Sequence, residues 1–320
     1  MKNQVTCRSM ILMIFSLMLF SCSYSQSFIP VTGRGTSIDK KINVSDFKGI
    51  DVSSGFDVIL EQGNSEALTL TLQENLFEYV TAKVENGTLR IYARNNIRPT
   101  QPMKARITFK GISNLKVSGG GDVFSETPVN VEALDINISG GGDFISEINS
   151  HELKYNISGG GDTDISGKSG NFYVNVSGGG DLNSKVSAER ISCRIGGGGD
   201  LYIRNEVHAS SAEIDINGGG DVDMKMNAEK LSCSVAGGGD ALISGQATEF
   251  DLDINGGGDA DAKNLSTENT SFRAGGGSDI HVCAAKGLTG YISGGGDVYY
   301  TGNPAKVSVD AKGGSEVHKE

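Results

Sequence analysis

The feature that most constrains the fold is a Gly-Gly-Gly-Asp motif that recurs at intervals of 18 to 21 residues, most often 19. Nine copies are strictly GGGD, and two further copies near the C-terminus read GGSD and GGSE. The acids that close these motifs are Asp122, Asp143, Asp162, Asp181, Asp200, Asp221, Asp240, Asp259, Asp279, Asp297 and Glu316. Self-similarity at one short period indicates a repeat architecture, in which each repeat is a structural unit that stacks on the next.

The residues between the motifs alternate between apolar and polar. Counting back from the acid, positions −9, −7 and −5 are mostly apolar and positions −8 and −6 are polar, as in Ile191, Cys193 and Ile195 before Asp200. This period of two predicts a strand with one buried face. Positions +1 and +3 after the acid are often apolar too and predict a second short strand. The variable polar residues between the two strands are expected to form a surface loop, which also takes the extra residues of the 21-residue copies.

Because every repeat has the same phase, like positions should stack in register along one axis. The sequence therefore predicts an all-β fold, a right-handed parallel β-helix of about 19-residue coils. The GGGD motif is expected at a corner, where glycine reaches backbone angles that other residues disfavour. A phosphate-binding role for the glycines is disfavoured, since the lysine, the Ser/Thr and the following helix of a P-loop are missing.

The first hundred residues have a different texture and suggest a division of the chain. We expect a signal peptide and lipobox over 1–22, a linker over 23–44, an N-terminal β-rich cap over 45–111, the GGGD-repeat β-helix over 112–316 and a tail over 317–320. Within the cap, the pattern predicts strands at 67–72, 82–84, 87–92 and 105–109 and a short helix at 74–80. Such a cap would cover strand edges that could otherwise pair with other chains.

The N-terminus is typical of an exported protein. Lys2 and Arg8 precede an apolar run over 10–20, which is too short to span a bilayer but suits a signal sequence. The run ends at Cys22 in a segment that resembles a bacterial lipobox, so Cys22 is a candidate for lipidation, with ordinary signal cleavage as the alternative. We expect export and a lipid anchor at the outer membrane, with the periplasmic or surface face left open.

The net charge of the chain argues against a nucleic-acid-binding function. Residues 1–21 hold two basic and no acidic side chains, so their removal changes the formal net charge from −11 to −13. Nucleic acid is therefore an unfavourable partner.

Cys193 and Cys233 lie at the same phase two coils apart. The distance between them is about 9.6 Å, which exceeds the reach of a disulfide. Both are expected to be buried free thiols, and Cys283 is expected to be unpaired as well.

The column of aspartates is the one feature that resembles a functional site. Stacked carboxylates about 4.8 Å apart repel by roughly 0.9 kcal/mol per neighbour in water, so something must offset the repulsion. Either glycine N–H groups of the same turn donate to each carboxylate, or cations such as Ca²⁺ lie between the acids. The candidate ligands are Asp122, Asp143, Asp162, Asp181, Asp200, Asp221, Asp240, Asp259, Asp279 and Asp297. Catalysis is disfavoured because these acids are spread evenly and the four histidines lie at unrelated phases.

Several segments resemble a known family of exported proteins. The matching residues are Phe47 to Val52, Gly55 to Val58, Glu74 to Leu76, Asn86 to Leu89 and the SGGGD coils. Together they resemble the family described as "putative auto-transporter adhesin, head GIN domain". The resemblance implies a right-handed β-helix and an adhesin-like role, and it carries over no binding residues.

These observations favour a non-catalytic, exported cell-envelope protein that serves in adhesion or scaffolding. Its expected partner is an envelope or extracellular protein or glycan, with no nucleic acid and with membrane contact only through the lipid anchor. One alternative is a Ca²⁺-binding repeat module that uses the aspartate column. Another is a carbohydrate-active β-helix enzyme.

Overall fold

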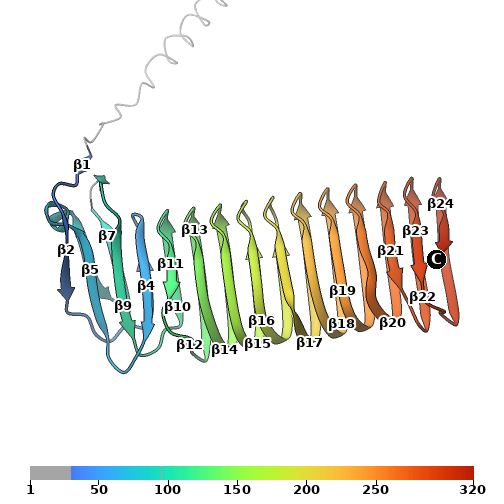
Figure 1. The fold of residues 1–320 in the computed structure, drawn as a ribbon, viewed down its shortest axis with the longest axis horizontal. Helices are drawn as coiled ribbons and strands as arrows, with labels where there is room; N and C mark the ends of the chain where they lie inside the picture. The colour runs from blue at the N-terminus through green and yellow to red at the C-terminus, as the bar shows by residue number, and fades with distance from the viewer. Residues whose placement is uncertain (1–29, 95) are drawn as a thin grey trace, which may run out of the picture.

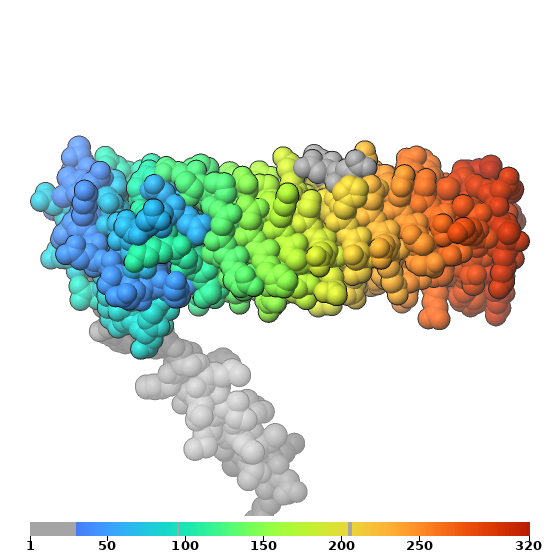
Figure 2. Space-filling view, turned by 90° about the horizontal axis from the view of Figure 1, so that it is seen from below, coloured from blue at the N-terminus to red at the C-terminus, as the bar shows by residue number. Residues whose placement is uncertain are grey.

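The protein is an elongated β-solenoid of about 11 turns, with successive coils about 19 residues apart (Figures 1 and 2). The computed structural model describes residues 30–94 and 96–320, so the predicted signal peptide and Cys22 lie outside the described residues. The predicted fold class, an all-β parallel β-helix with an N-terminal cap, is confirmed. Within the described residues no helix has the length and apolar character needed to cross a membrane.

The coils stack in parallel, each pairing with the coil before it and the coil after it. Leu153, for example, pairs with Phe172 in the next coil, 19 residues later. The strands of the coils are β10 (Asn114–Gly119), β11 (Val123–Ser125), β12 (Val129–Asn130), β13 (Ala133–Gly140), β14 (Phe144–Gly159), β15 (Thr163–Val176), β16 (Leu182–Ile195), β17 (Leu201–Gly218), β18 (Val222–Gly237), β19 (Ala241–Gly256), β20 (Ala260–Gly276), β21 (Ile280–Cys283), β22 (Gly287–Gly294), β23 (Val298–Thr301), β24 (Lys306–Gly313) and β25 (Val317–Lys319).

The polar segment between the two predicted strands of a coil is not a loop, and this prediction was wrong. In β14 to β20 one strand runs from just after the acid to the next glycine corner or to within two residues of it. The reason is that neighbouring coils supply ladder partners to this segment too, as in the pairing of Asn149 with Lys168. The extra residues of the longer copies do fall here, between β11 and β12 and at a register shift between Ile203 and Val207.

The predicted inward columns form one continuous apolar core from Phe47 to Val298. Ile214, midway between Cys193 and Cys233, is fully buried. The two cysteines are buried free thiols, as predicted, and burial raises the pKa of each to about 12. Burying an aliphatic side chain such as Ile214 contributes about 1.5–3 kcal/mol to the free energy of folding, and every coil repeats this contribution.

The N-terminal end is closed by antiparallel strands. The strands of this end are β1 (Val31–Thr32), β2 (Ser37–Ile42), β3 (Gly49–Val52), β4 (Phe56–Gln62), β5 (Ala67–Gln73), β6 (Val80–Glu85), β7 (Thr88–Ala93), β8 (Ile97–Arg98) and β9 (Met103–Phe109). β2 pairs with β5, β5 with β9, and β6 with β7, while β3 and β4 continue the parallel stack into the first coils. The predicted short helix is a 3₁₀ turn, η1 (Glu74–Tyr79).

The edge strand of this cap lies in the segment expected to be a linker. β2 reads Ser-Ile-Asp-Lys-Lys-Ile and is mostly exposed. Charged side chains on an edge strand oppose pairing with other chains, so β2 protects this edge of the sheet from such pairing. The segment expected to be a linker thus contributes the strands β1 and β2 to this end.

Candidate functional site: the glycine–aspartate corner and the polar groove

At the glycine–aspartate corner, which comprises the stacked GGGD motifs, the chain leaves the regular ladder for three residues. The N–H of the middle glycine still donates to the previous coil, as Gly160 does to the carbonyl of Gly140 at 2.9 Å. The carbonyl of each Asp accepts from the previous coil too, as Asp162 does from the N–H of Phe144 at 2.9 Å. The Asp N–H has no such backbone partner, and a buried or half-buried N–H without an acceptor is costly.

The carboxylates of the column satisfy those N–H groups. The N–H of Asp200 donates to Oδ1 of Asp181 at 3.0 Å, and the N–H of Asp221 donates to Oδ1 of Asp200 at 2.8 Å. The same bond joins every successive pair of acids from Asp57 to Glu316, at 2.8–3.3 Å. The predicted donors, glycine N–H groups of the same turn, are thus replaced by the Asp N–H of the next coil.

This ladder limits what the column can offer a cation. One oxygen of each bonded carboxylate already accepts a backbone N–H, and at Asp200 the other accepts the Tyr202 hydroxyl at 2.9 Å. Ca²⁺ takes six to eight oxygen ligands. Across the described chain, no group of three or more His, Cys, Asp or Glu side chains could hold a metal ion together. All ten predicted aspartates do lie on one edge of the solenoid, one per coil.

The three glycines of the corner are not equivalent. A Cβ on the first glycine of a motif, such as Gly159, would lie 1.8 Å from the carbonyl oxygen of Gly140. A Cβ on the third, Gly161, would lie 2.0 Å from that of Gly142. The middle glycine, Gly160, is exposed and would meet nothing within 4 Å. Close backbone stacking therefore explains the first and third columns, and nothing in the structure explains the second.

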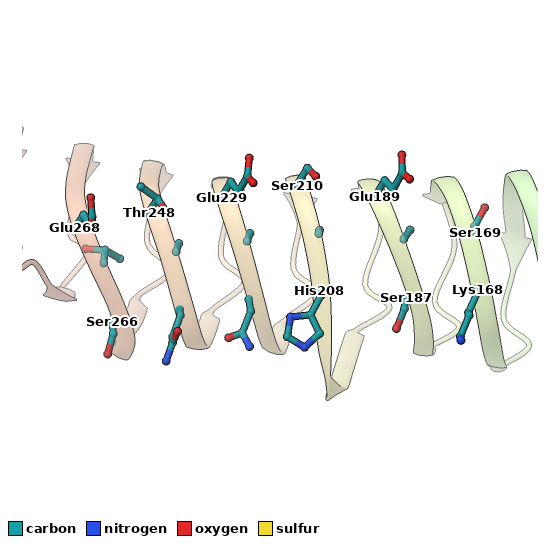
Figure 3. A pocket seen from close by; sticks show the side chains of 17 residues that line it. Lys168, Ser169, Ser187, Glu189, His208, Ser210, Glu229, Thr248, Ser266 and Glu268 are labelled. Atoms are coloured by element: carbon teal, nitrogen blue, oxygen red, sulfur yellow. The ribbon is translucent and has the colours of Figure 1, made fainter.

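A second corner of the coil, which sequence reasoning placed in a loop, forms a groove of about 810 Å³ along the solenoid axis. Its floor is a column of small side chains, in which Ala228 pairs with Ala209 and Ala247 of the neighbouring coils. Figure 3 shows the two rims on either side of this floor. We call this surface the polar groove; its lining is Lys168, Ser169, Ser187, Ala188, Glu189, His208, Ala209, Ser210, Asn227, Ala228, Glu229, Gln246, Ala247, Thr248, Ser266, Thr267 and Glu268.

The two rims differ in charge. One rim alternates acid and hydroxyl in successive coils, and its members are Glu189, Ser210, Glu229, Thr248 and Glu268 (Figure 3). The other rim presents hydroxyl and amide side chains, with Lys168 at one end and His208 near the middle. Glu268 is engaged by Lys286, whose Nζ lies 2.7 Å from Oε2. The variable residues of the repeat were the signal for this surface, but only stacking shows that they enclose a concave space.

Two of the four histidines are not at unrelated phases, so that prediction was wrong. His281 and His318 pair through Tyr299 in one column. Their rings stack on the tyrosine ring, with centroids 4.7 Å and 5.0 Å away. Partial desolvation, followed by the nearby acids Asp297 and Asp279, raises the pKa of Tyr299. The sequence signal was present, since both histidines follow their motif acid by two residues.

Comparison with known proteins identifies the family of this chain. The family model described as "Putative auto-transporter adhesin, head GIN domain" matches residues 46–206 and again 192–304. The chain belongs to this family. No curated protein matches it.

The chain is also similar to several solved structures. A protein of Parabacteroides distasonis described as a "putative lipid binding protein" is 22% identical, with a TM-score of 0.41, over 91% of this chain and 100% of its own. A "putative adhesin" from Bacteroides fragilis is 18% identical, with a TM-score of 0.36 and the same two coverages. A second P. distasonis protein, described as a "putative adhesin", is 19% identical, with a TM-score of 0.42, again over 91% and 100%.

Proposed function

We propose that this head GIN domain protein is an exported, non-catalytic binding protein of adhesin type, anchored by a lipid on Cys22 at the outer membrane. The polar groove is the surface that contacts its partner. The observation that carries this proposal is the groove itself, which continues across six coils and has rims of mostly polar side chains that differ from coil to coil. A continuous groove on a rigid rod suits an extended partner.

The glycine–aspartate corner supports the same proposal by contrast. Its acids each accept a backbone N–H of the next coil, so they have a structural role that needs no ligand. The polar groove has no comparable internal requirement, because the backbone under it is already paired within the ladder. The exposed rim acids Glu189 and Glu229 are therefore available for recognition.

The anchor is tested by fractionating producing cells. Cys22→Ser should move the protein from the membrane fraction to the soluble fraction, because the diacylglyceryl thioether can form only on a cysteine. A variant that stays in the membrane fraction would contradict lipidation at this residue.

The adhesive role is tested on intact cells, first by protease shaving and then by adhesion to immobilised extracellular proteins and glycans. We expect shaving to remove the solenoid and Glu189→Lys with Glu229→Lys to reduce adhesion. The control pair Glu147→Lys with Glu213→Lys changes the charge equally at exposed positions outside the groove. Full protection from protease, or equal adhesion by both pairs, would contradict the proposal.

A further inference from the structure

The acids on one rim of the polar groove recur at every second coil. Glu189 and Glu229 are separated by one intervening coil that presents Ser210, and Glu268 follows Glu229 with Thr248 between them (Figure 3). Since neighbouring strands are about 4.8 Å apart, the acids are spaced by about 9.6 Å. The alternation of acid with a short hydroxyl gives the rim a defined step as well as a negative charge.

The geometry points to a partner of one class: an extended polypeptide segment that carries lysine or arginine at about every third residue. This inference rests on the proposed function and names the chemistry of its partner. In the polyproline II conformation three residues advance the chain by about 9.3 Å, close to the two-coil step of the rim. A basic side chain at every third position would then face one carboxylate after another without distortion of either chain.

The solenoid itself shows that a rim acid binds a lysine ammonium. Lys286 extends from the segment that precedes β22 and places Nζ 2.7 Å from Oε2 of Glu268. Within the described residues, Glu189 and Glu229 have no such cation and both are exposed. They are therefore the two positions at which an external ammonium or guanidinium could take the place that Lys286 takes at Glu268.

The opposite rim and the floor fit the backbone of the same segment. The side chain of Gln246 carries an amide donor, and the hydroxyls of Ser187 and Ser266 lie along the same rim. A polyproline II chain has no internal hydrogen bonds, so its carbonyls are open to such donors. The floor, a column of alanines, leaves room for the chain between the rims. Strand addition is excluded at this place because the groove backbone is already paired on both sides.

The test uses the full mature protein and two labelled peptides of equal length and composition, at low ionic strength. The spaced peptide repeats Lys-Pro-Pro four times, and the clustered peptide places the four lysines in one block ahead of all the prolines. We expect the spaced peptide to bind more tightly than the clustered one.

Variants of the rim assign the preference to its acids. Glu189→Gln with Glu229→Gln should weaken the spaced peptide by roughly fivefold, as expected for two exposed ion pairs, and erase the preference. The pair Glu147→Gln with Glu213→Gln should leave binding unchanged. Ser210→Glu, which adds an acid in the intervening coil, should relax the spacing preference.

Other outcomes overturn the inference. Equal binding of the two peptides, binding to neither, or an unchanged affinity in the double Gln variant would each exclude an evenly spaced basic partner. If the peptides fail while cells still adhere through the groove, the partner is a different polymer, such as a neutral glycan, and the proposed function stands. If adhesion is indifferent to Glu189→Lys with Glu229→Lys, the proposed function itself fails.

Discussion

The two corners of the coil arise from the same stacking of coils but differ in how strictly their residues repeat. At the glycine–aspartate corner each coil repeats the same residues, because backbones approach so closely that a Cβ on the first or third glycine would overlap a carbonyl. At the polar groove, successive coils present Lys168, Ser187, His208, Asn227 and Gln246 along one rim. In the columns of the first and third glycines and of the acid, strict repetition marks a place where the solenoid constrains the residue. Variation on a concave surface is where we propose that a partner is recognised.

The aspartates illustrate why repetition alone is a poor guide to function. A column of carboxylates resembles a binding site when it is read as a sequence. In the structure each carboxylate fills a need of the next coil, since the corner leaves one N–H per coil without a backbone acceptor. The charge strengthens that hydrogen bond at the expense of repulsion along the column.

The largest effect is expected from filling the close approach at the glycine–aspartate corner. Gly161→Ala would place a Cβ 2.0 Å from the carbonyl oxygen of Gly142, which is backbone and cannot move aside. We expect a loss of at least about 3 kcal/mol in the free energy of unfolding, measured by denaturant titration. The matched control is Gly160→Ala, which meets open space and should change stability by less than about 1 kcal/mol. Equal losses in the two variants would contradict the assignment.

A smaller effect is expected from breaking the aspartate ladder. Asp181→Ala removes the acceptor of the Asp200 N–H and should cost about 1–2 kcal/mol, the loss of a charge-assisted hydrogen bond less the repulsion that it relieves. Asp181→Asn keeps an acceptor oxygen and should stay within about 0.5 kcal/mol of the wild type. Thermal and denaturant unfolding of the two variants measures the difference. If Asn were as damaging as Ala, the negative charge rather than the acceptor would be essential.

Calcium is expected to have a smaller effect still. Because one carboxylate oxygen of each bonded acid is already engaged, millimolar Ca²⁺ should leave the melting temperature essentially unchanged, as should its removal by a chelator. A cation held by the folded state at about one hundred times its dissociation constant would add about 2.7 kcal/mol and would be easily seen. A calcium-dependent rise that disappears in Asp181→Asn with Asp200→Asn would favour the cation-binding alternative.

A similarly small effect on stability is expected at the polar groove. Glu189→Gln with Glu229→Gln should change the free energy of unfolding by no more than about 0.5 kcal/mol, because both side chains are exposed and without an ionic partner in the described part of the chain. The same pair is expected to change peptide binding. A marked loss of stability in this variant would mean that the rim is structural, and the contrast between the two corners would disappear.

The sequence by itself determined the solenoid. The 19-residue period, the alternating columns and the glycines can be satisfied together only by coils stacked in register, and the buried positions Ile191, Cys193 and Ile195 followed from that period. It also determined that one edge carries an acid in every coil. Local alternation and a fixed repeat are enough for these conclusions because each coil contacts only its neighbours.

Only the tertiary structure decided what those residues do. It extended the strands through the segment predicted to be a loop, because ladder partners come from coils 19 residues away. It assigned each aspartate to the N–H of the next coil, which depends on where a bend interrupts the ladder. It also enclosed the polar groove, because concavity arises from the way successive corners stack and no single coil contains it.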